Sequence, residues 1–213
     1  MHTHLLIESI EKLLADTSLY ASAIEINDPD LAIYKDKFKE NENLIAEETL
    51  KVNNIIANAE IKEDLKLLFA IKIKVLRTYN VHYEEVSNLL KAITELKKED
   101  ANFEMYVMLG AWIDCKNAWT NLPPIHHEES DRNAIEIAEA VRLTNQYPDI
   151  VKIIAVGNEA MVKWATSYYV TPNIILKWVN HLQNLKKENK LSKDVLITSS
   201  DNFASWGGGD SEY

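Results

Sequence analysis

The sequence predicts an α/β protein whose strands form a parallel sheet. From residue 60 onward, short apolar stretches alternate with amphipathic ones in the order αβαβαβαβ. Four stretches have the composition of strands, at residues 71–79, 104–109, 152–156 and 195–199. Strands separated by helices pair in parallel through right-handed crossovers. We therefore expect one sheet whose four strand exits lie at the same edge.

Each predicted strand has a recognisable pattern. Residues 71–79, IKIKVLRTY, alternate β-branched and polar side chains. Residues 105–109 are continuously apolar, as in a strand that is covered on both faces. The distances in sequence between consecutive strands are 32, 48 and 42 residues, measured between Val75, Val107, Ala155 and Ile197. Each interval is long enough for one strand and one helix, with loop insertions.

Amphipathic helices are predicted between these strands, at residues 84–97 and 131–146 and from Thr171-Pro172 onward. Apolar side chains recur in them at intervals of three and four residues. Threonine is a suitable N-cap and proline suits the first helical position. Tyr147-Pro148 ends the preceding helix, because proline cannot continue it.

The N-terminal 59 residues are predicted as a separate helical segment, and residues 60–213 as the α/β domain. Residues 5–14 have the spacing of a short amphipathic helix. Residues 35–48 are dominated by charge and are interpreted as a solvated loop or helix face.

The remainder of the N-terminal segment is less regular. Either of two short apolar patches, residues 21–26 and 31–34, could be a first strand. Residues 44–69 return to a helical pattern, and three asparagines in its middle predict two helical pieces rather than one: Asn53, Asn54 and Asn58.

Two architectures fit alternating strands and helices: a doubly wound sheet and a (β/α)8 barrel. No G-x-G-x-x-G and no G-x-x-x-x-G-K follows a predicted strand, which removes the main support for a nucleotide-binding sheet. We therefore predict part of a (β/α)8 TIM barrel, from strand one or two to strand five. A complete barrel typically needs about 250 residues.

The composition excludes several classes of partner. The net charge of −10 and the pI near 5.1 argue against a surface that follows nucleic-acid phosphates. Cys115 is the single cysteine, so no internal disulfide can form. The N-terminus lacks a basic region before its apolar residues, and no stretch has the length of a membrane span. We expect a soluble chain without a signal peptide, and its localisation and oligomeric state stay open.

The groups that leave the predicted strands are polar and aromatic. They are, in chain order, Arg77, Tyr79 and Asn80, then Trp112 and Asp114, then Asn158, Glu159 and Trp164, then Asp201, Asn202 and Trp206. Aromatic rings stack on the C–H faces of sugars while Asn, Asp and Arg bind the hydroxyls. This edge is thus a candidate carbohydrate site, although tryptophans could also merely cap the core.

Glu159 is the principal catalytic candidate, because it follows an apolar strand in the stretch VKIIAVGNEAMVKW. In parallel α/β folds, ligands bind where the strands end. A plain turn is the alternative reading, in which Gly157 and Asn158 supply backbone freedom and Glu159 is solvated.

Three motifs carry a resemblance to a known family. VGNEA, LRTY and VMLGAWID, each at the end of a predicted strand, resemble glycoside hydrolase family 17, the β-1,3-glucanases, over roughly residues 61–213. The resemblance implies that Glu159 is the general acid/base and that Asn158 binds the 2-hydroxyl. It also implies that Arg77 and Tyr79 line the site near the nucleophile, that the substrate is a β-glucan or oligosaccharide and that no cofactor is needed.

The resemblance is incomplete in the first and the later strands. The family's nucleophile is a glutamate at the end of strand seven, and no residue here matches its motif; Asp201, Asp210 and Glu212 are the nearest carboxylates. Residues 31–38 could be a degraded first strand. The sequence thus predicts a C-terminally truncated, β-1,3-glucan-directed hydrolase barrel that is catalytically incomplete because the nucleophile is absent. The alternative is a barrel fragment that binds carbohydrate without hydrolysis. A metabolic barrel enzyme of another kind would require a phosphate or metal site.

Two further motifs are interpreted as loops. The sequence His126-His127-Glu128-Glu129 lacks the H-E-x-x-H spacing of a zinc site and is predicted to be a solvated loop. No basic residue follows the three glycines at 207–209, so they predict a flexible turn rather than a phosphate cradle.

Overall fold

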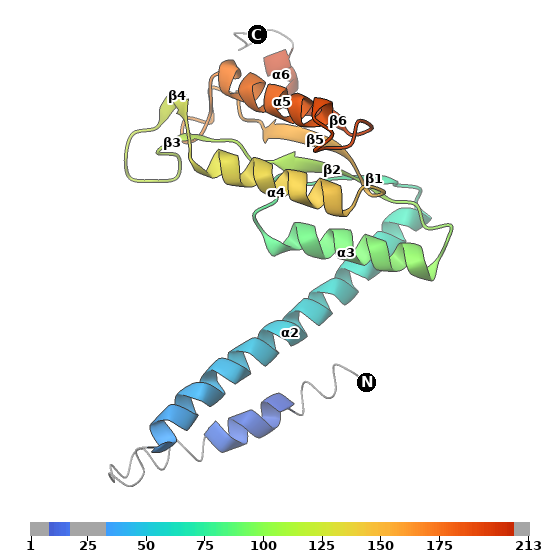
Figure 1. The fold of residues 1–213 in the computed structure, drawn as a ribbon, viewed down its shortest axis with the longest axis vertical. Coiled ribbons are helices and arrows are strands. Elements are labelled where there is room, and N and C mark those ends of the chain that lie inside the picture. The colour runs from blue at the N-terminus through green and yellow to red at the C-terminus, as the bar shows by residue number, and fades with distance from the viewer. Residues whose placement is uncertain (1–8, 18–32, 207–213) are drawn as a thin grey trace. The chain divides into compact units, whose positions relative to one another are not determined.

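The computed structural model of the 213-residue chain describes residues 9–17 and 33–206. The chain divides into two compact units, Met1–Ile61 and Lys62–Tyr213. In the first unit, residues 9–17 form a helix, as the periodicity of residues 5–14 predicts. A long helix, α2 (Ile33–Ala70), begins in the first unit and ends in the second (Figure 1).

The continuity of α2 decides one open alternative and corrects two expectations. Residues 35–48 are the solvated helix face rather than the loop. Residues 44–69 form one helix rather than two pieces, and residues 33–38 are helical rather than a degraded strand. An asparagine costs only a few tenths of a kcal/mol in a helix, which does not outweigh the hydrogen bonds that continue through the segment. The other candidate strand, residues 21–26, lies outside the described residues.

The second unit contains a four-stranded, fully parallel sheet in the order β1-β2-β5-β6. Its strands are β1 (Val75–Arg77), β2 (Tyr106–Ala111), β5 (Val151–Asn158) and β6 (Leu196–Ser200). The four sequence-predicted strands are therefore confirmed, with boundaries that shift by a few residues.

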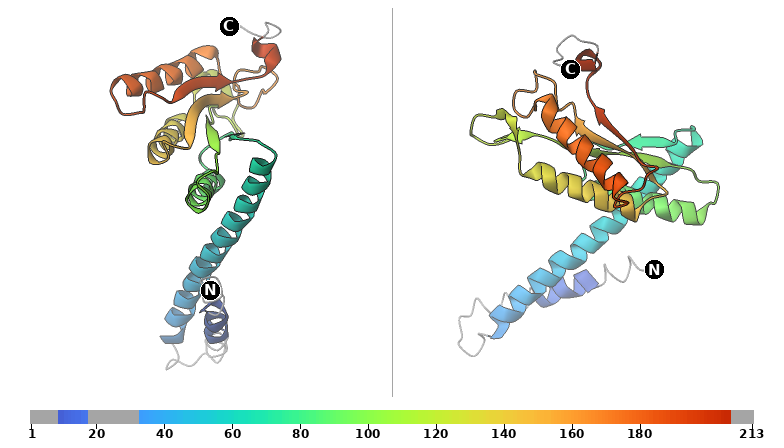
Figure 2. Two further views of the ribbon diagram at one scale, coloured as in Figure 1. Left: turned by 90° about the vertical axis from the view of Figure 1, so that its right-hand side faces the viewer. Right: turned by 45° about the horizontal axis from the view of Figure 1, so that its top comes forward.

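Three helices connect these strands: α3 (Glu84–Glu99), α4 (Arg132–Gln146) and α5 (Pro172–Lys187). All three lie on one face of the sheet (Figure 2). The central strands β2 and β5 bury their apolar side chains under these helices, with Val107, Leu109 and Ile154 fully enclosed. Pro172 begins α5 as predicted, but the Thr171 side chain does not cap it.

The order of the strands bears on the choice between the two architectures. Each new strand is added beside the preceding one, and the order never reverses as it does in a doubly wound sheet. The sheet is open, with β1 and β6 as its edges. The α/β class with a parallel sheet is thus confirmed, whereas the closed barrel stays a prediction.

A small antiparallel pair, absent from the sequence prediction, joins β2 to α4. It consists of β3 (Cys115–Lys116) and β4 (Ile125–Glu129). The His126–Glu129 segment, predicted to be a solvated loop, therefore forms a strand. A last short helix, α6 (Phe203–Trp206), follows β6. None of the helices among the described residues combines the length and the apolarity needed to cross a membrane.

Candidate functional site

The exit of β5 has an unusual backbone that presents Glu159. Gly157 has a φ of +79°, and a Cβ there would lie 2.9 Å from the Cβ of Ala160 and 3.0 Å from Cδ1 of Ile175. Only glycine fits both conditions. Glu159 itself has a φ of +48°, in the left-handed region that non-glycine residues seldom occupy. Its N–H donates to the carbonyl of Ser200 at 2.9 Å, which fixes this turn against β6.

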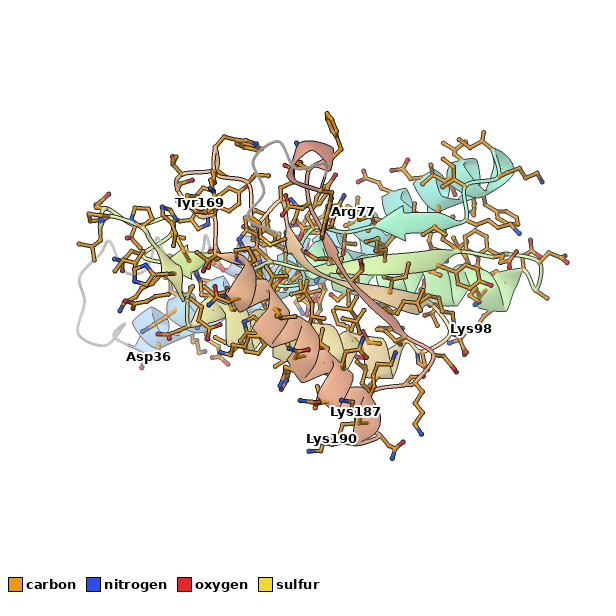
Figure 3. The ribbon with its side chains drawn as sticks, turned by 90° about the horizontal axis from the view of Figure 1, so that it is seen from above. Asp36, Arg77, Lys98, Tyr169, Lys187 and Lys190 are labelled. Carbon is orange, nitrogen blue, oxygen red and sulfur yellow. The ribbon has the colours of Figure 1, made fainter. Side chains whose placement is uncertain are left out.

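The end of β1 meets the end of β5 although β2 lies between them. The guanidinium of Arg77 donates to Oδ1 of Asn158, and its Cζ lies 5.1 Å from the centroid of the Tyr79 ring. Figure 3 shows Arg77 towards the same end of the sheet as Tyr169, with Lys98 and Lys187 towards the other end. The structure thus brings together three predicted site residues: Arg77, Tyr79 and Asn158.

The exit of β6 adds a second carboxylate, Asp201, to the same end of the sheet. Its Oδ2 accepts from the N–H of Met161 at 3.0 Å, and its Oδ1 accepts from the N–H of Asn202 at 2.8 Å. Burial raises the pKa of the Tyr168 hydroxyl, and the negative charges of Glu159 and Asp201 raise it further. Tyr168 therefore lies within electrostatic reach of both carboxylates. We call the group Arg77, Tyr79, Asn158, Glu159 and Asp201 the carboxylate edge.

Other predicted residues line a pocket of about 670 Å³ between the loops that follow β1 and β2 and the first turns of α4. We call it the aromatic pocket. Its lining residues are Asn80, His82, Tyr83, Trp112, Asp114, Trp119, Arg132, Ile135 and Glu136. Three of the residues predicted from the sequence belong to it: Asn80, Trp112 and Asp114. None of the residues of the carboxylate edge is among those that line it.

An aromatic cluster connects the pocket with the carboxylate edge. The Trp112 and Trp119 rings have centroids 6.4 Å apart, and the Tyr168 ring lies 5.2 Å from Trp112 and 5.3 Å from Trp119. Val170, two residues after Tyr168, donates its N–H to the carbonyl of Ala160, the residue that follows Glu159, at 2.7 Å, so the two regions are neighbours. Trp164 is 61% exposed and is not among the residues that line the pocket.

Asp114 is the most deeply buried charged group of the pocket, with 2% of its surface exposed. Burial raises the pKa of this carboxyl, while Arg132 and the side chains of Ser130, Trp112 and Trp119 pull the pKa down. Arg132 donates to Oδ2 at 2.7 Å, whereas Oδ1 has no partner in hydrogen-bonding geometry. The buried Oδ1 of Asn80 also lacks a partner. Two residues that line the pocket thus each have a buried acceptor oxygen whose hydrogen-bonding capacity is unmet.

The first turns of α4 hold the loop that follows β2. Asn133, 1% exposed, accepts from the N–H of Asp114 at 3.0 Å and donates to its carbonyl at 2.9 Å. Three residues along the helix, the carboxylate of Glu136 accepts from the N–H of Trp112 at 3.0 Å. The sequence analysis missed both residues, because a polar side chain in an amphipathic helix is ordinarily interpreted as solvated.

The histidine-rich strand β4 is occupied by structural contacts. The His126 ring stacks on Tyr169 with centroids 3.6 Å apart, Glu128 pairs with Lys116 at 2.7 Å, and Glu129 accepts from the indole of Trp178 at 2.7 Å. These contacts tie β3 and β4 to each other and to the start of α5. Over residues 9–17 and 33–206, no three His, Cys, Asp or Glu side chains gather in a way that could hold a metal ion.

Comparison with known proteins gives one informative match. Neither the scan of protein-family models nor the search of curated proteins finds a match. Among solved structures, the chain is similar to an endo-laminarinase from Formosa Hel1_33_131, with 70% sequence identity over 72% of this chain and a TM-score of 0.70. The chain spans 39% of the length of that protein. The relationship to a glucan hydrolase is thus supported at the level of sequence and fold.

Proposed function

We propose that this chain is a glycoside hydrolase-like protein that acts on β-1,3-glucan. The observation that carries the proposal is its 70% identity to an endo-laminarinase over 72% of its length. Identity at this level, together with a TM-score of 0.70, supports a common fold rather than a general α/β likeness.

The finer proposal assigns the chain to glycoside hydrolase family 17 and its sheet to strands two to five of a (β/α)8 barrel. Three observations support it. The strands are added in sequence order, the helices α3, α4 and α5 all cover one face, and Glu159 follows a strand at the edge where barrel active sites form. Glu159 also has a left-handed backbone conformation, which is unfavourable for a non-glycine residue. Strained residues of this kind are often found at functional sites, which supports a functional role for Glu159.

Glu159 is proposed as the general acid/base of a retaining double displacement. In that reaction Glu159 would protonate the glycosidic oxygen while a second carboxylate attacks the anomeric carbon, and Glu159 would then deprotonate the water that releases the sugar. The family's nucleophile motif has no counterpart in these 213 residues, so the proposal assigns the acid/base role alone and leaves the nucleophile unassigned. Asn158, whose Oδ1 accepts from Arg77, is proposed to bind the 2-hydroxyl of the sugar. Asp201 is not proposed as the nucleophile, because it follows β6 and does not match the family's nucleophile motif.

A second candidate function is carbohydrate binding without hydrolysis. The aromatic pocket favours it, since Trp112 and Trp119 line it beside polar side chains, and aromatic faces combined with hydrogen-bonding groups are the features that bind a neutral sugar. This function needs no nucleophile. It uses Trp112, Asn80 and Asp114 rather than Glu159.

Reducing-sugar release from laminarin separates the two functions. The chain and its Glu159→Gln variant are assayed together, and both are titrated calorimetrically with laminari-oligosaccharides. Release by the chain that falls at least a hundredfold in the variant supports catalysis by Glu159, because general acid/base groups contribute about 10² to 10⁴ in rate. Binding without release supports the second function. Absence of both binding and release would contradict the proposal.

A further inference from the structure

The buried carboxylate of Glu136 occupies a position that none of the chemistry above uses. It lies on α4 with 5% of its surface exposed. Its Oε1 accepts two backbone N–H groups, from Val81 at 2.6 Å and from Trp112 at 3.0 Å. Its Oε2 lies 3.0 Å from Nδ1 of His82.

The two backbone donors belong to different loops. Val81 lies in the loop that follows β1, and Trp112 lies in the loop that follows β2. The regular pairing of the strands ends at Arg77 and Met108. Just beyond, Thr78 and Gly110 still exchange contacts, since the N–H of Gly110 donates to Oγ1 of Thr78 at 3.0 Å. Beyond these residues, Val81 and Trp112 both donate to Glu136, so this carboxylate contacts both loops.

Glu136 therefore continues the connection between β1 and β2 where the hydrogen-bond ladder ends. Buried backbone N–H groups need acceptors, and an ionised carboxylate is a stronger acceptor than a carbonyl. One side chain on a third element thus fixes the separation of the two loops. Those loops carry Asn80 on one side and Trp112 and Asp114 on the other, which are the walls of the aromatic pocket.

We propose that Glu136 is a positioning residue that sets the width of the aromatic pocket by joining the β1 and β2 exit loops. This proposal depends on the proposed function only in taking a β-1,3-glucan oligosaccharide as the ligand of the pocket. The joining of the loops by Glu136 does not depend on the ligand. Asn133, by contrast, holds only the β2 loop, through both backbone groups of Asp114.

The first experiment is amide hydrogen exchange of the full chain by NMR. In Glu136→Ala, we expect the N–H groups of both Val81 and Trp112 to exchange about tenfold faster or more, because each loses a bond to a buried charged acceptor. Glu136→Gln retains an acceptor oxygen and should restore protection at both positions. Asn133→Ala should accelerate exchange at Asp114 and leave Val81 unchanged.

Two controls separate positioning from general stability. Ile137→Ala, a buried apolar change on the same helix, lowers global stability without touching the carboxylate. In this variant, amide exchange at Val81 and Trp112 should not increase more than amide exchange in the sheet. Glu139→Gln, a carboxylate that pairs with Arg142 on the same helix, should behave as the unaltered chain. If the Glu136→Ala chain does not fold, Glu136→Asp takes its place, because aspartate retains the carboxylate on a side chain that is one methylene shorter. We expect this variant to lose exchange protection at Val81, at Trp112 or at both.

The second experiment is the affinity for laminari-oligosaccharides. We expect binding to weaken about tenfold in Glu136→Ala and to recover in Glu136→Gln. Unchanged exchange at Val81 and Trp112 in both the Ala and the Asp variants overturns the joining of the loops. Faster exchange with unchanged affinity overturns its control of the pocket. If the unaltered chain binds no sugar, the proposed function fails, and the exchange measurement still decides whether Glu136 joins the loops.

Discussion

The carboxylate edge and the aromatic pocket are neighbouring regions built in opposite ways. At the carboxylate edge, polar groups are satisfied within the protein: Asp201 accepts two backbone N–H groups, and Asn158 accepts from Arg77. In the aromatic pocket, Asn80 and Asp114 each have a buried oxygen without a partner. The first arrangement fixes the orientation of Asp201 and Asn158, whereas the second leaves two buried oxygens with unmet hydrogen-bonding capacity. We therefore expect substitutions in the two regions to differ in their effects.

The two regions also depend on glycine in different ways, which predicts the largest effects. At Gly110, on the side of the pocket, an added Cβ would lie 2.3 Å from the carbonyl oxygen of Thr78, a backbone atom. At Gly157 it would meet two side-chain carbons, at a positive φ. We expect Gly110→Ala to lower the free energy of unfolding by about 3 kcal/mol or more and Gly157→Ala by about 2 kcal/mol. Urea unfolding measures both free energies. An equal loss of stability in the two variants would mean that the backbone at Thr78 yields to the added Cβ as easily as the side chains near Gly157 do.

Truncation of aromatic residues tests whether the pocket, rather than the edge, binds sugar. Trp112 lines the pocket and Trp164 does not. We expect Trp112→Ala to weaken laminari-oligosaccharide binding about tenfold, because a stacked ring contributes roughly 1.5 kcal/mol. Trp164→Ala should change the affinity less than twofold. Titration calorimetry gives both values, and a larger loss for Trp164 would move the binding site away from the pocket.

The burial of Asp114 predicts a pH dependence with a defined sign. Its folded pKa is raised, so the folded state holds the proton more tightly than the unfolded state does. The resulting stabilisation is complete below the ordinary Asp pKa of about 3.9 and is lost as the pH rises through the raised folded pKa. We expect Asp114→Asn to remove this loss. Melting temperatures of both chains from acid to neutral pH would then converge at low pH and separate at neutral pH, and parallel curves would contradict the expectation.

The smallest effect tests the electrostatic link between the two regions. The charges of Glu159 and Asp201 add to burial in raising the pKa of Tyr168. We expect Glu159→Gln to lower that pKa, because the phenolate then forms beside one negative charge fewer. Ultraviolet titration of the variant and the unaltered chain, each corrected with a Tyr168→Phe counterpart, isolates this hydroxyl. An unchanged pKa would place Glu159 too far from Tyr168 to act on it.

The fold of the second unit follows from its sequence because its strands are buried under helices. Residues 106–109 and 153–156 are continuously apolar, and they lie in the central strands β2 and β5. The pair β3 and β4 was not predictable in this way. IHHEE has no apolar alternation, and its stability comes from partners distant in sequence, such as the contact of Glu129 with Trp178.

The candidate site was predictable residue by residue but not as a geometry. Strand exits identify Glu159, Trp112 and Asp114, since each follows an apolar run. The division into two regions depends on how the loops fold back, and Glu136 and Asn133 on α4 are the residues whose side chains bond the backbone of those loops. Those two residues form no distinctive pattern in the sequence. Their partners are backbone groups, which do not depend on residue type and therefore leave no signal.

The left-handed backbone of Glu159 has a consequence for how this position tolerates change. A non-glycine residue in this conformation costs about 1 kcal/mol or more, and glycine or asparagine would relieve that cost. In a library of variants selected only for folded protein, position 159 should therefore drift towards glycine and asparagine. In the same library selected for growth on laminarin, glutamate should persist. The contrast between the two selections reveals whether the carboxylate is kept for its chemistry.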